Sequence, residues 1–381
     1  MVCKKAQGDS EVACYTHSGE LPAIWDSFIP EGHFLKKEAI AITEQIQLPD
    51  VGFLYILITK NGAPQAAAYF QVLGLKDKHV NSEKVSSMQA FLWKTFTAVA
   101  KPKILVAGHL FRHDVPSYYW QPELSAFEAY QYYQQAITAA LDKSCANAAL
   151  VKDTPEALTT YFQHYAPQYL LLRNDISMEM AIPAEWHSMH EYEKALKHKY
   201  AQRYRKVRNA FAPLEIKELN AQEVTAQKDE IYKLYLGVTE QQQVRMGFLN
   251  KDFLPMLKAK YDNLKVWGVY EAGKMIAFLS AWVKEDAFDM FYIGFDYSKN
   301  NTYQLYFNIL FFAIEQAIAN NKPKLILGRT ALEAKARLGC KPHYLSTFLY
   351  IRNGFIRNRV LQIQQHTFAQ EGAWEERHPL K

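Results

Sequence analysis

The sequence has 381 residues, of which 49% are hydrophobic and 22% charged, and a formal net charge of +5. This composition is typical of a packed globular protein and excludes a disordered, collagen-like or low-complexity chain. Because single hydrophobic cores stop growing at roughly 250 to 300 residues, the length predicts two domains, each large enough for a core of its own.

The positive charge is concentrated in one segment. Residues 194–208 contain seven lysines and arginines and no acidic residue, whereas the rest of the chain has 37 basic and 39 acidic residues, a net charge of −2. This distribution disfavours a protein that binds nucleic acid over its whole surface. Any such binding is expected to involve this segment alone.

Cysteine spacing and apolar run length disfavour three further classes. The four cysteines are far apart and form no CxxC or Cys/His ligand pattern, so we expect neither a disulfide framework nor a metal site. The N-terminal residues lack the apolar core of a signal peptide, and runs such as 51–58 are far shorter than the ~20 residues of a membrane helix. We therefore expect a cytoplasmic protein without membrane insertion.

The first half of the chain begins with a predicted hairpin. Strands at 53–59 and 65–73 flank the dipeptide Asn61-Gly62, a strong hairpin-turn signal. The later elements follow in chain order: a strand at 103–110, a helix at 125–141, a strand at 148–152, a helix that opens at Thr154-Pro155, and a strand at 169–182.

A basic helix at 188–210 is predicted to link the halves, before a strand at 214–219 and helices at 222–236 and 251–260. Its apolar residues recur every three or four positions and predict one buried stripe: Tyr192, Leu196, Tyr200, Tyr204, Val207 and Phe211. The basic side chains on the other side, among them Lys199, Arg203 and Arg205, face either water or a polyanion such as RNA.

The second half shows the element order βββαβαβ. Its predicted elements are strands at 265–271, 274–283 and 288–294, a helix at 302–320, a strand at 324–328, a helix at 330–338 and a strand at 344–351. The first half repeats this order with about 36 extra residues, mostly around 75–102. We therefore predict an α/β (α+β) protein of two tandem domains, 1–185 and 186–381, each a mixed, mostly antiparallel sheet flanked by helices.

Polar residues gather where two strands of the second half end. Lys299, Asn301 and Thr302 lie at the start of the helix at 302–320, whose free N–H groups favour an anion. The simpler interpretation is that Asn301 or Thr302 only caps the helix, because a cap needs no ligand. Arg329 follows the strand at 324–328, where it can orient an anionic substrate group. Glu333 and Arg337 follow Arg329 at intervals of four residues, so the three side chains are expected on one helix face with alternating charge. Lys335 lies on another face.

In the first half, the strand at 103–110 ends in the sequence Gly-His-Leu-Phe-Arg-His-Asp. His109 at this strand end can act as a general base, and Arg112 can bind an anion. The other interpretation is that His109 only packs or caps.

Three segments resemble the GNAT acyltransferase superfamily and, in tandem, the FemABX-like aminoacyltransferases. They are the hairpin WGVYEAGKMIAFLSAW at 267–282, the strand, polar loop and helix YIGFDYSKNNTYQLYFNILFFAIEQAI at 292–318, and the basic helix AQRYRKVRNA at 201–210. The chain departs from the family at 296–304, because this loop contains no glycine, whereas the family's acyl-CoA loop is glycine-rich.

The resemblance implies an acyltransferase that moves an acyl or aminoacyl group from acyl-CoA or aminoacyl-tRNA to a small-molecule or peptide amine. In such a reaction a backbone N–H of a splayed strand polarises the acyl carbonyl, and the strand at 288–294 is the expected place. Tyr292 or Tyr350 would protonate the leaving group. The alternative is a ligand-binding protein that retains the tandem fold without catalysis.

Overall fold

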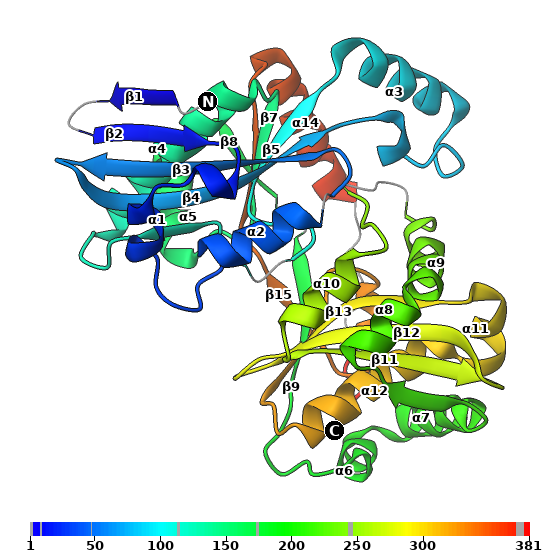
Figure 1. Cartoon of the computed structure of the whole chain (residues 1–381). Helices are drawn as coiled ribbons and strands as arrows, with labels where there is room; N and C mark the ends of the chain where they lie inside the picture. The colour runs from blue at the N-terminus through cyan, green and yellow to red at the C-terminus, as the bar shows by residue number, and fades with distance from the viewer. Residues whose placement is uncertain are drawn as a thin grey trace. The chain divides into compact units, whose positions relative to one another are not determined.

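The computed structural model describes residues 3–7, 10–46, 48–112, 115–172, 175–242, 247–370 and 377–381, with side chains from residue 10 to 362 within these ranges and again from 377. The chain forms two compact units (Figure 1). The first consists of Met1–Asn174, Gln243–Asn250 and Leu345–Glu371, and the second of Asp175–Gln242, Lys251–Tyr344 and Gly372–Lys381. Neither unit is one continuous stretch of sequence.

The first unit is built on a nine-stranded mixed sheet. Its strands are β1 (Cys3–Gln7), β2 (Ser10–Tyr15), β3 (Val51–Lys60), β4 (Ala63–Gly74), β5 (Lys103–Ala107), β6 (Tyr118–Trp120), β7 (Ala148–Val151), β8 (Tyr169–Leu172) and β16 (Thr347–Ile351). Its helices are η1 (Ser18–Glu20), α1 (Ala23–Phe28), α2 (Lys37–Gln45), η2 (Asp77–His79), α3 (Ser87–Ala100), α4 (Ala126–Ser144), α5 (Glu156–Tyr165) and α14 (Gly354–Gln370).

The side chains of β3 point alternately to the two faces of this sheet, and each face has a hydrophobic core. Ile56 and Ile58 pack with α4 and α5, whereas Tyr55 and Leu57 pack on the other side with Trp25 of α1 and the helix α2. Successive side chains of a strand point to opposite faces, so one apolar run contributes to both cores. The predicted hairpin is β3 and β4, with Asn61 and Gly62 at positive φ in its turn.

The second unit contains a seven-stranded mixed sheet. Its strands are β9 (Ile176–Ala181), β10 (Glu215–Glu218), β11 (Leu264–Glu271), β12 (Lys274–Val283), β13 (Phe288–Phe295), β14 (Lys324–Gly328) and β15 (Lys341–Tyr344). Its helices are α6 (Met189–Ala195), α7 (His198–Phe211), α8 (Ala221–Ala226), α9 (Lys228–Thr239), α10 (Phe253–Lys260), α11 (Tyr297–Tyr303), α12 (Leu305–Ala319) and α13 (Leu332–Ala336). The apolar residues of α6, α7 and α12 form its main core against the sheet.

The two sheets have the same strand order and the same pairing directions. In the first, β2, β3, β4, β5, β7, β16 and β8 follow one another, and β5 and β7 are the parallel pair. In the second, the order is β10, β11, β12, β13, β14, β9 and β15, with β13 and β14 parallel. The predicted fold class of two mixed, mostly antiparallel sheets flanked by helices is confirmed.

Each sheet contains one strand from the part of the chain that forms the other sheet, and the sequence does not predict this exchange. The predicted strand 169–182 is two strands, β8 in the first sheet and β9 in the second, where β9 lies between β14 and β15. Conversely, β16 of the predicted strand 344–351 lies between β7 and β8 of the first sheet. A division at residue 185 would therefore separate both strands from their sheets. The polar sequence Arg-Asn-Asp at 173–175 interrupts the apolar run at the first of these breaks.

Two predicted helices are also divided. The basic helix 188–210 is α6 followed by α7, because Leu196 between them has an extended backbone. The helix 302–320 is α11 followed by α12, because Gln304 between them adopts a left-handed conformation. A single apolar periodicity runs through each pair, so it did not reveal the breaks.

Candidate functional site

The parallel strands β13 and β14 separate soon after they begin. Their ladder pairs are Phe288 with Leu325 and Asp289 with Ile326, at the start of both strands. On the other side of β13, the register with β12 shifts between Leu279 and Ala281, which indicates a bulge. By contrast, β5 and β7 of the first unit pair over four positions, and the Lys152 N–H continues the ladder to the Ala107 carbonyl.

The bulge in β13 is held by a buried serine of β12. The Ser280 hydroxyl donates to the Tyr292 carbonyl at 2.9 Å and accepts from the Tyr292 N–H at 3.0 Å. Its side chain thus replaces the ladder partner that the register shift removes. The expectation that this strand is splayed is consistent with the geometry, but the N–H of Tyr292 itself is already bonded.

Gly294 allows helix α9 to lie directly on β13. A Cβ atom at Gly294 would lie 2.5 Å from the backbone carbon of Leu234 and 2.6 Å from the backbone nitrogen of Tyr235. These distances are far below van der Waals contact, so only glycine allows this approach. The close contact fixes the end of β13 next to the bulge.

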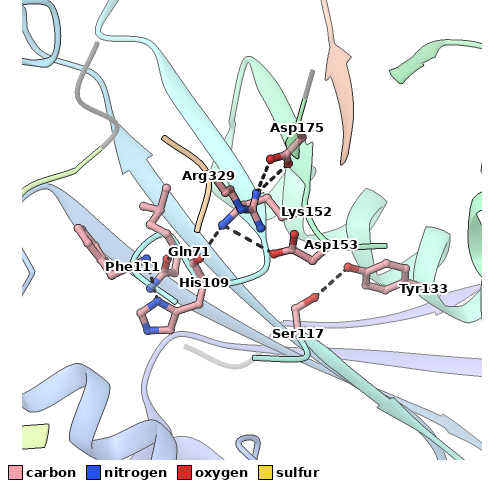
Figure 2. Close-up of polar contacts among 10 residues, drawn as sticks. Gln71, His109, Phe111, Ser117, Tyr133, Lys152, Asp153, Asp175 and Arg329 are labelled. Carbon is pink, nitrogen blue, oxygen red and sulfur yellow. Dashed lines mark hydrogen bonds and ion pairs between the residues drawn. The ribbon is translucent and has the colours of Figure 1, made fainter. Parts of the chain in front are cut away.

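Arg329, directly after β14, forms an ion pair with Asp175, directly before β9 (Figure 2). Its Nη1 lies 2.8 Å from Oδ1 and 2.7 Å from Oδ2 of the carboxylate. The two side chains are 23% and 16% exposed. The predicted place of Arg329 at a strand end is therefore correct, and its partner Asp175 was not anticipated.

Lys335 of α13 is buried, with an exposed fraction of 2%, and its Nζ donates to the carbonyl of Gly328 at 3.1 Å. Burial lowers the pKa of Lys335 from 10.5 to about 8, and the nearby Cys340 side chain opposes part of this shift. Burial likewise raises the pKa of Cys340 to about 12. The end of β14 therefore has a lysine whose charge is poised near neutral pH, which is a property of many functional residues.

Glu333 and Arg337 form one pair of the predicted ion-pair series, whereas Arg329, its first member, pairs with Asp175 instead. The Arg337 guanidinium lies 3.8 Å from the Glu333 carboxylate. Such an exposed pair four residues apart adds only a few tenths of a kcal/mol. These two residues thus fit the structural interpretation rather than a binding site.

The polar residues before α12 do not surround a free helix end. Lys299 lies within α11 and forms an ion pair with Glu271 at 2.9 Å, and Tyr303 donates a hydrogen bond to the same carboxylate. The side chain of Asp296 caps α11 by accepting from Ser298, and Asn300 accepts from the N–H of Tyr306 in α12. The predicted helix start at Thr302 is wrong, and Asn301 and Thr302 belong to α11. An acidic cap disfavours a bound anion at this helix end.

The two predicted tyrosines belong to different sheets. Tyr292 lies in β13 of the second unit, in edge contact with Tyr235 and Phe253, and burial raises its pKa well above the usual value. Tyr350 lies in β16 of the first sheet, paired with Ala149, and its ring is tilted against that of Tyr169 at 5.1 Å between centroids. The expectation that Tyr350 ends the second sheet is wrong, because β16 is the exchanged strand.

The basic helix α7 packs through the predicted apolar stripe. Tyr204, Val207 and Phe211 are buried, and Leu196 and Tyr192 are buried before them. On the other side, Arg203 lies over the ring of Phe307 at 4.6 Å, and Arg205 forms an ion pair with Glu193 at 2.5 Å. Lys199 is exposed. Arg203 and Arg205, two of the three residues predicted to face water or a polyanion, thus contact other side chains of the protein.

His109 of the first unit lies inside the protein, with an exposed fraction of 2% (Figure 2). Its Nδ1 accepts from the Phe111 N–H at 3.1 Å, and its carbonyl accepts from Lys152 Nζ at 2.9 Å. Arg112 lies over the ring of Phe34 at 5.8 Å. These contacts fit the packing interpretation. The neighbouring His113 and Asp114 lie outside the described residues.

Membrane-spanning helices and metal-ligand clusters are absent from the part of the chain that the structure describes. No helix there combines the length and the apolar character needed to cross a bilayer. Nor do three His, Cys, Asp or Glu side chains in these ranges come together in a way that could hold a metal ion.

No protein-family model matches the sequence, and no curated protein matches it. Among the solved structures that are similar to this chain are three proteins of the following kinds. FemX is 10% identical, with 92% of this chain and 98% of that chain covered and a TM-score of 0.48. A tandem GNAT protein from the clavulanic acid biosynthesis pathway is 7% identical, with coverages of 90% and 99% and a TM-score of 0.47.

The third is L-PGS from Bacillus licheniformis, 11% identical, with coverages of 86% and 96% and a TM-score of 0.46. The structural neighbours therefore include the tandem GNAT and FemX proteins that the sequence resembles. The similarity is too low to support any conclusion about activity.

Proposed function

We propose that the chain is an acyltransferase with its active site in the second unit, at the carboxyl ends of β13 and β14. The observation that carries this proposal is the early separation of the two strands after Asp289 and Ile326. Where parallel strands separate, their backbone N–H and C=O groups become available to an extended ligand. The tightly paired β5 and β7 of the first unit offer no such opening.

The proposed chemistry is attack of a neutral amine on the acyl carbonyl of an activated donor. Backbone N–H groups of β13 beyond the bulge polarise the carbonyl and stabilise the tetrahedral oxyanion. When the intermediate collapses, the bond to the leaving sulfur or oxygen breaks, and the leaving group takes a proton. Tyr292, whose phenol is protonated at neutral pH, would supply this proton and take up in return the proton that the attacking nitrogen loses.

Arg329 and Lys335 supply positive charge at the end of β14 in this proposal. Asp175 orients the planar guanidinium of Arg329 through two contacts to one nitrogen. Lys335 holds the Gly328 carbonyl and thereby fixes the loop that carries Arg329, so we treat it as a positioning residue.

The cap of α11 bears on which activated donor the site would take. The Asp296 cap of α11 occupies the Ser298 N–H and places a negative charge at a helix end that an acyl-CoA pyrophosphate would otherwise use. This favours a donor held elsewhere along the strand end, and aminoacyl-tRNA is the other donor class that the resemblance implies. The acceptor is an amine of a small molecule or peptide.

The test is a transfer assay with matched variants of one ion pair. Wild-type protein, Arg329→Ala and Asp175→Asn are incubated with acyl-CoAs or aminoacyl-tRNAs and a panel of amines, and amide products are measured by mass spectrometry. Both variants break the ion pair, but only Asp175→Asn keeps the guanidinium. Donor binding is followed in parallel by the shift in melting temperature.

We expect Arg329→Ala to lose donor binding and transfer, and Asp175→Asn to keep a substantial part of both. Equal losses in the two variants, together with equal falls in melting temperature without ligand, would assign Arg329 a structural role only. Donor binding without amide product for any amine would support the ligand-binding alternative. If no donor of either class binds the wild type, the acyltransferase proposal is wrong.

A further inference from the structure

Helix α3 of the first unit leaves five of its apolar side chains exposed. Met88, Phe91, Leu92, Phe96 and Val99 have exposed fractions between 46% and 80%. Their spacing of three, four and seven residues places them on one face of the helix. The helix lies within residues 75–102, the part of the first half that has no counterpart in the second.

The opposite face of α3 attaches the helix to the protein and so determines its orientation. The Trp93 indole N–H donates to the Lys76 carbonyl at 3.2 Å, and Thr97 is buried. The N-terminus is closed by a capping box, in which the Ser86 hydroxyl accepts from the Gln89 N–H and the Gln89 side chain accepts from the Ser86 N–H. The exposed apolar face therefore belongs to a regular, capped helix (Figure 1).

The apolar face is large for a surface feature. Aromatic side chains present about 150–250 Å² each, and those of Phe91 and Phe96 are roughly half to two-thirds exposed. With Met88, Leu92 and Val99, the patch is on the order of 500 Å². Patches of this size on a soluble protein usually mark an interaction site.

Lysines lie on helix α3 and at both of its ends. Residues 76–103 contain six lysines and two acidic residues, Asp77 and Glu83, a net charge of +4, and two of these lysines, Lys76 and Lys78, form ion pairs with Asp50. Lys94 lies on the helix itself, Lys84 precedes it and Lys101 ends it, and all three side chains are exposed. An apolar face rimmed by lysines complements a surface that is apolar beneath and negatively charged above.

We propose that α3 is a lipid-binding element that lies on an anionic membrane surface. Phe91, Leu92 and Phe96 would enter the boundary between headgroups and acyl chains, and the lysines would remain at the level of the phosphates. A second copy of the chain fits this face less well, because a twofold interface brings the same patch together and opposes lysine to lysine. The proposal is independent of the acyltransferase function.

The test is flotation of the full-length protein with vesicles. One set of vesicles is pure phosphatidylcholine, and the other is an equimolar mixture of phosphatidylcholine and phosphatidylglycerol. The test variant is the double substitution Phe91→Asp and Phe96→Asp. The control is Tyr344→Asp, which places the same charge on an exposed aromatic residue of the second unit. Circular dichroism melts check that both variants fold.

We expect the wild type and Tyr344→Asp to float with the anionic vesicles, with a bound fraction reduced by high salt and about tenfold lower on neutral vesicles. The double variant should stay with the soluble fraction at an unchanged melting temperature. Absence of wild-type binding to anionic vesicles overturns the proposal, as does undiminished binding of the double variant. If light scattering shows a dimer that only the double variant fails to form, and the wild type does not bind vesicles, the apolar face of α3 contacts a second copy of the chain instead.

Discussion

Replacing Lys335 with methionine is expected to change how the stability of the protein depends on pH. The pKa of this buried lysine falls from 10.5 in the unfolded chain to about 8 in the folded protein. Between these values the unfolded chain binds more protons than the folded protein, so the unfolding free energy rises with pH. Below about pH 8 both forms are protonated, and the folded protein retains the full penalty of a buried charge.

The shift of roughly 2.5 pKa units corresponds to about 3 kcal/mol. The wild type should therefore gain about 3 kcal/mol relative to Lys335→Met as the pH rises from 7 to 10.5, mostly between pH 8 and 10. The measurement is urea unfolding of both proteins across this range. Taking the difference between them removes the titration of tyrosines and other groups common to both.

Lys341→Met, which removes an exposed lysine of β15, controls for the loss of a charge as such. The Gly328 carbonyl loses its partner in Lys335→Met, which costs about 1–3 kcal/mol at every pH and shifts the whole curve without changing its slope. A difference between wild type and Lys335→Met that is constant with pH would refute the lowered pKa and, with it, the titratable amine proposed at the end of β14.

Three further predictions concern the fold around this site. Gly294→Ala should lower the unfolding free energy by several kcal/mol in a denaturant titration, because its methyl group would meet the backbone of α9. The control is Gly52→Ala, where the nearest atom to the new methyl group lies at 4.0 Å, and its effect should be below about 1 kcal/mol. Ser280→Ala should lower the unfolding free energy by about 1–3 kcal/mol, since the N–H of Tyr292 loses its acceptor, and an unchanged midpoint would contradict the role of Ser280 in the bulge. Fragments 1–185 and 186–381 should show cooperative unfolding by circular dichroism only after mixing, because each lacks a strand of its own sheet, and a cooperative transition in either fragment alone would disprove this.

The repeated element order was visible in the sequence because it depends on local patterns. The alternating residues of β3 and β4 around Asn61-Gly62, and the apolar stripe from Tyr192 to Phe211, are dictated by side-chain periodicity and turn chemistry. These features can be predicted without knowing which distant segments of the chain pair with one another.

The exchange of β9 and β16 could not be predicted in this way. Both strands are apolar runs that fit the centre of either sheet, and which sheet receives them depends on long-range pairing. The same limit applies to the site. Arg329 at a strand end followed from the βαβ pattern, but its partner Asp175 lies 154 residues away along the chain. The burial of Lys335 could not be predicted from the sequence, because a charged residue in a polar segment is normally exposed.

The position of β16 has a consequence for synthesis on the ribosome. Chains emerge N-terminus first, and domains generally fold as they appear. Here β7 and β8 are made early, but the strand that joins them, Thr347–Ile351, begins 175 residues after Leu172. Until it arrives, the inner edges of β7 and β8 remain unpaired and open to wrong partners. The first unit to be translated is therefore the last to complete its sheet, and nascent chains of this protein should depend on protection by chaperones during that interval.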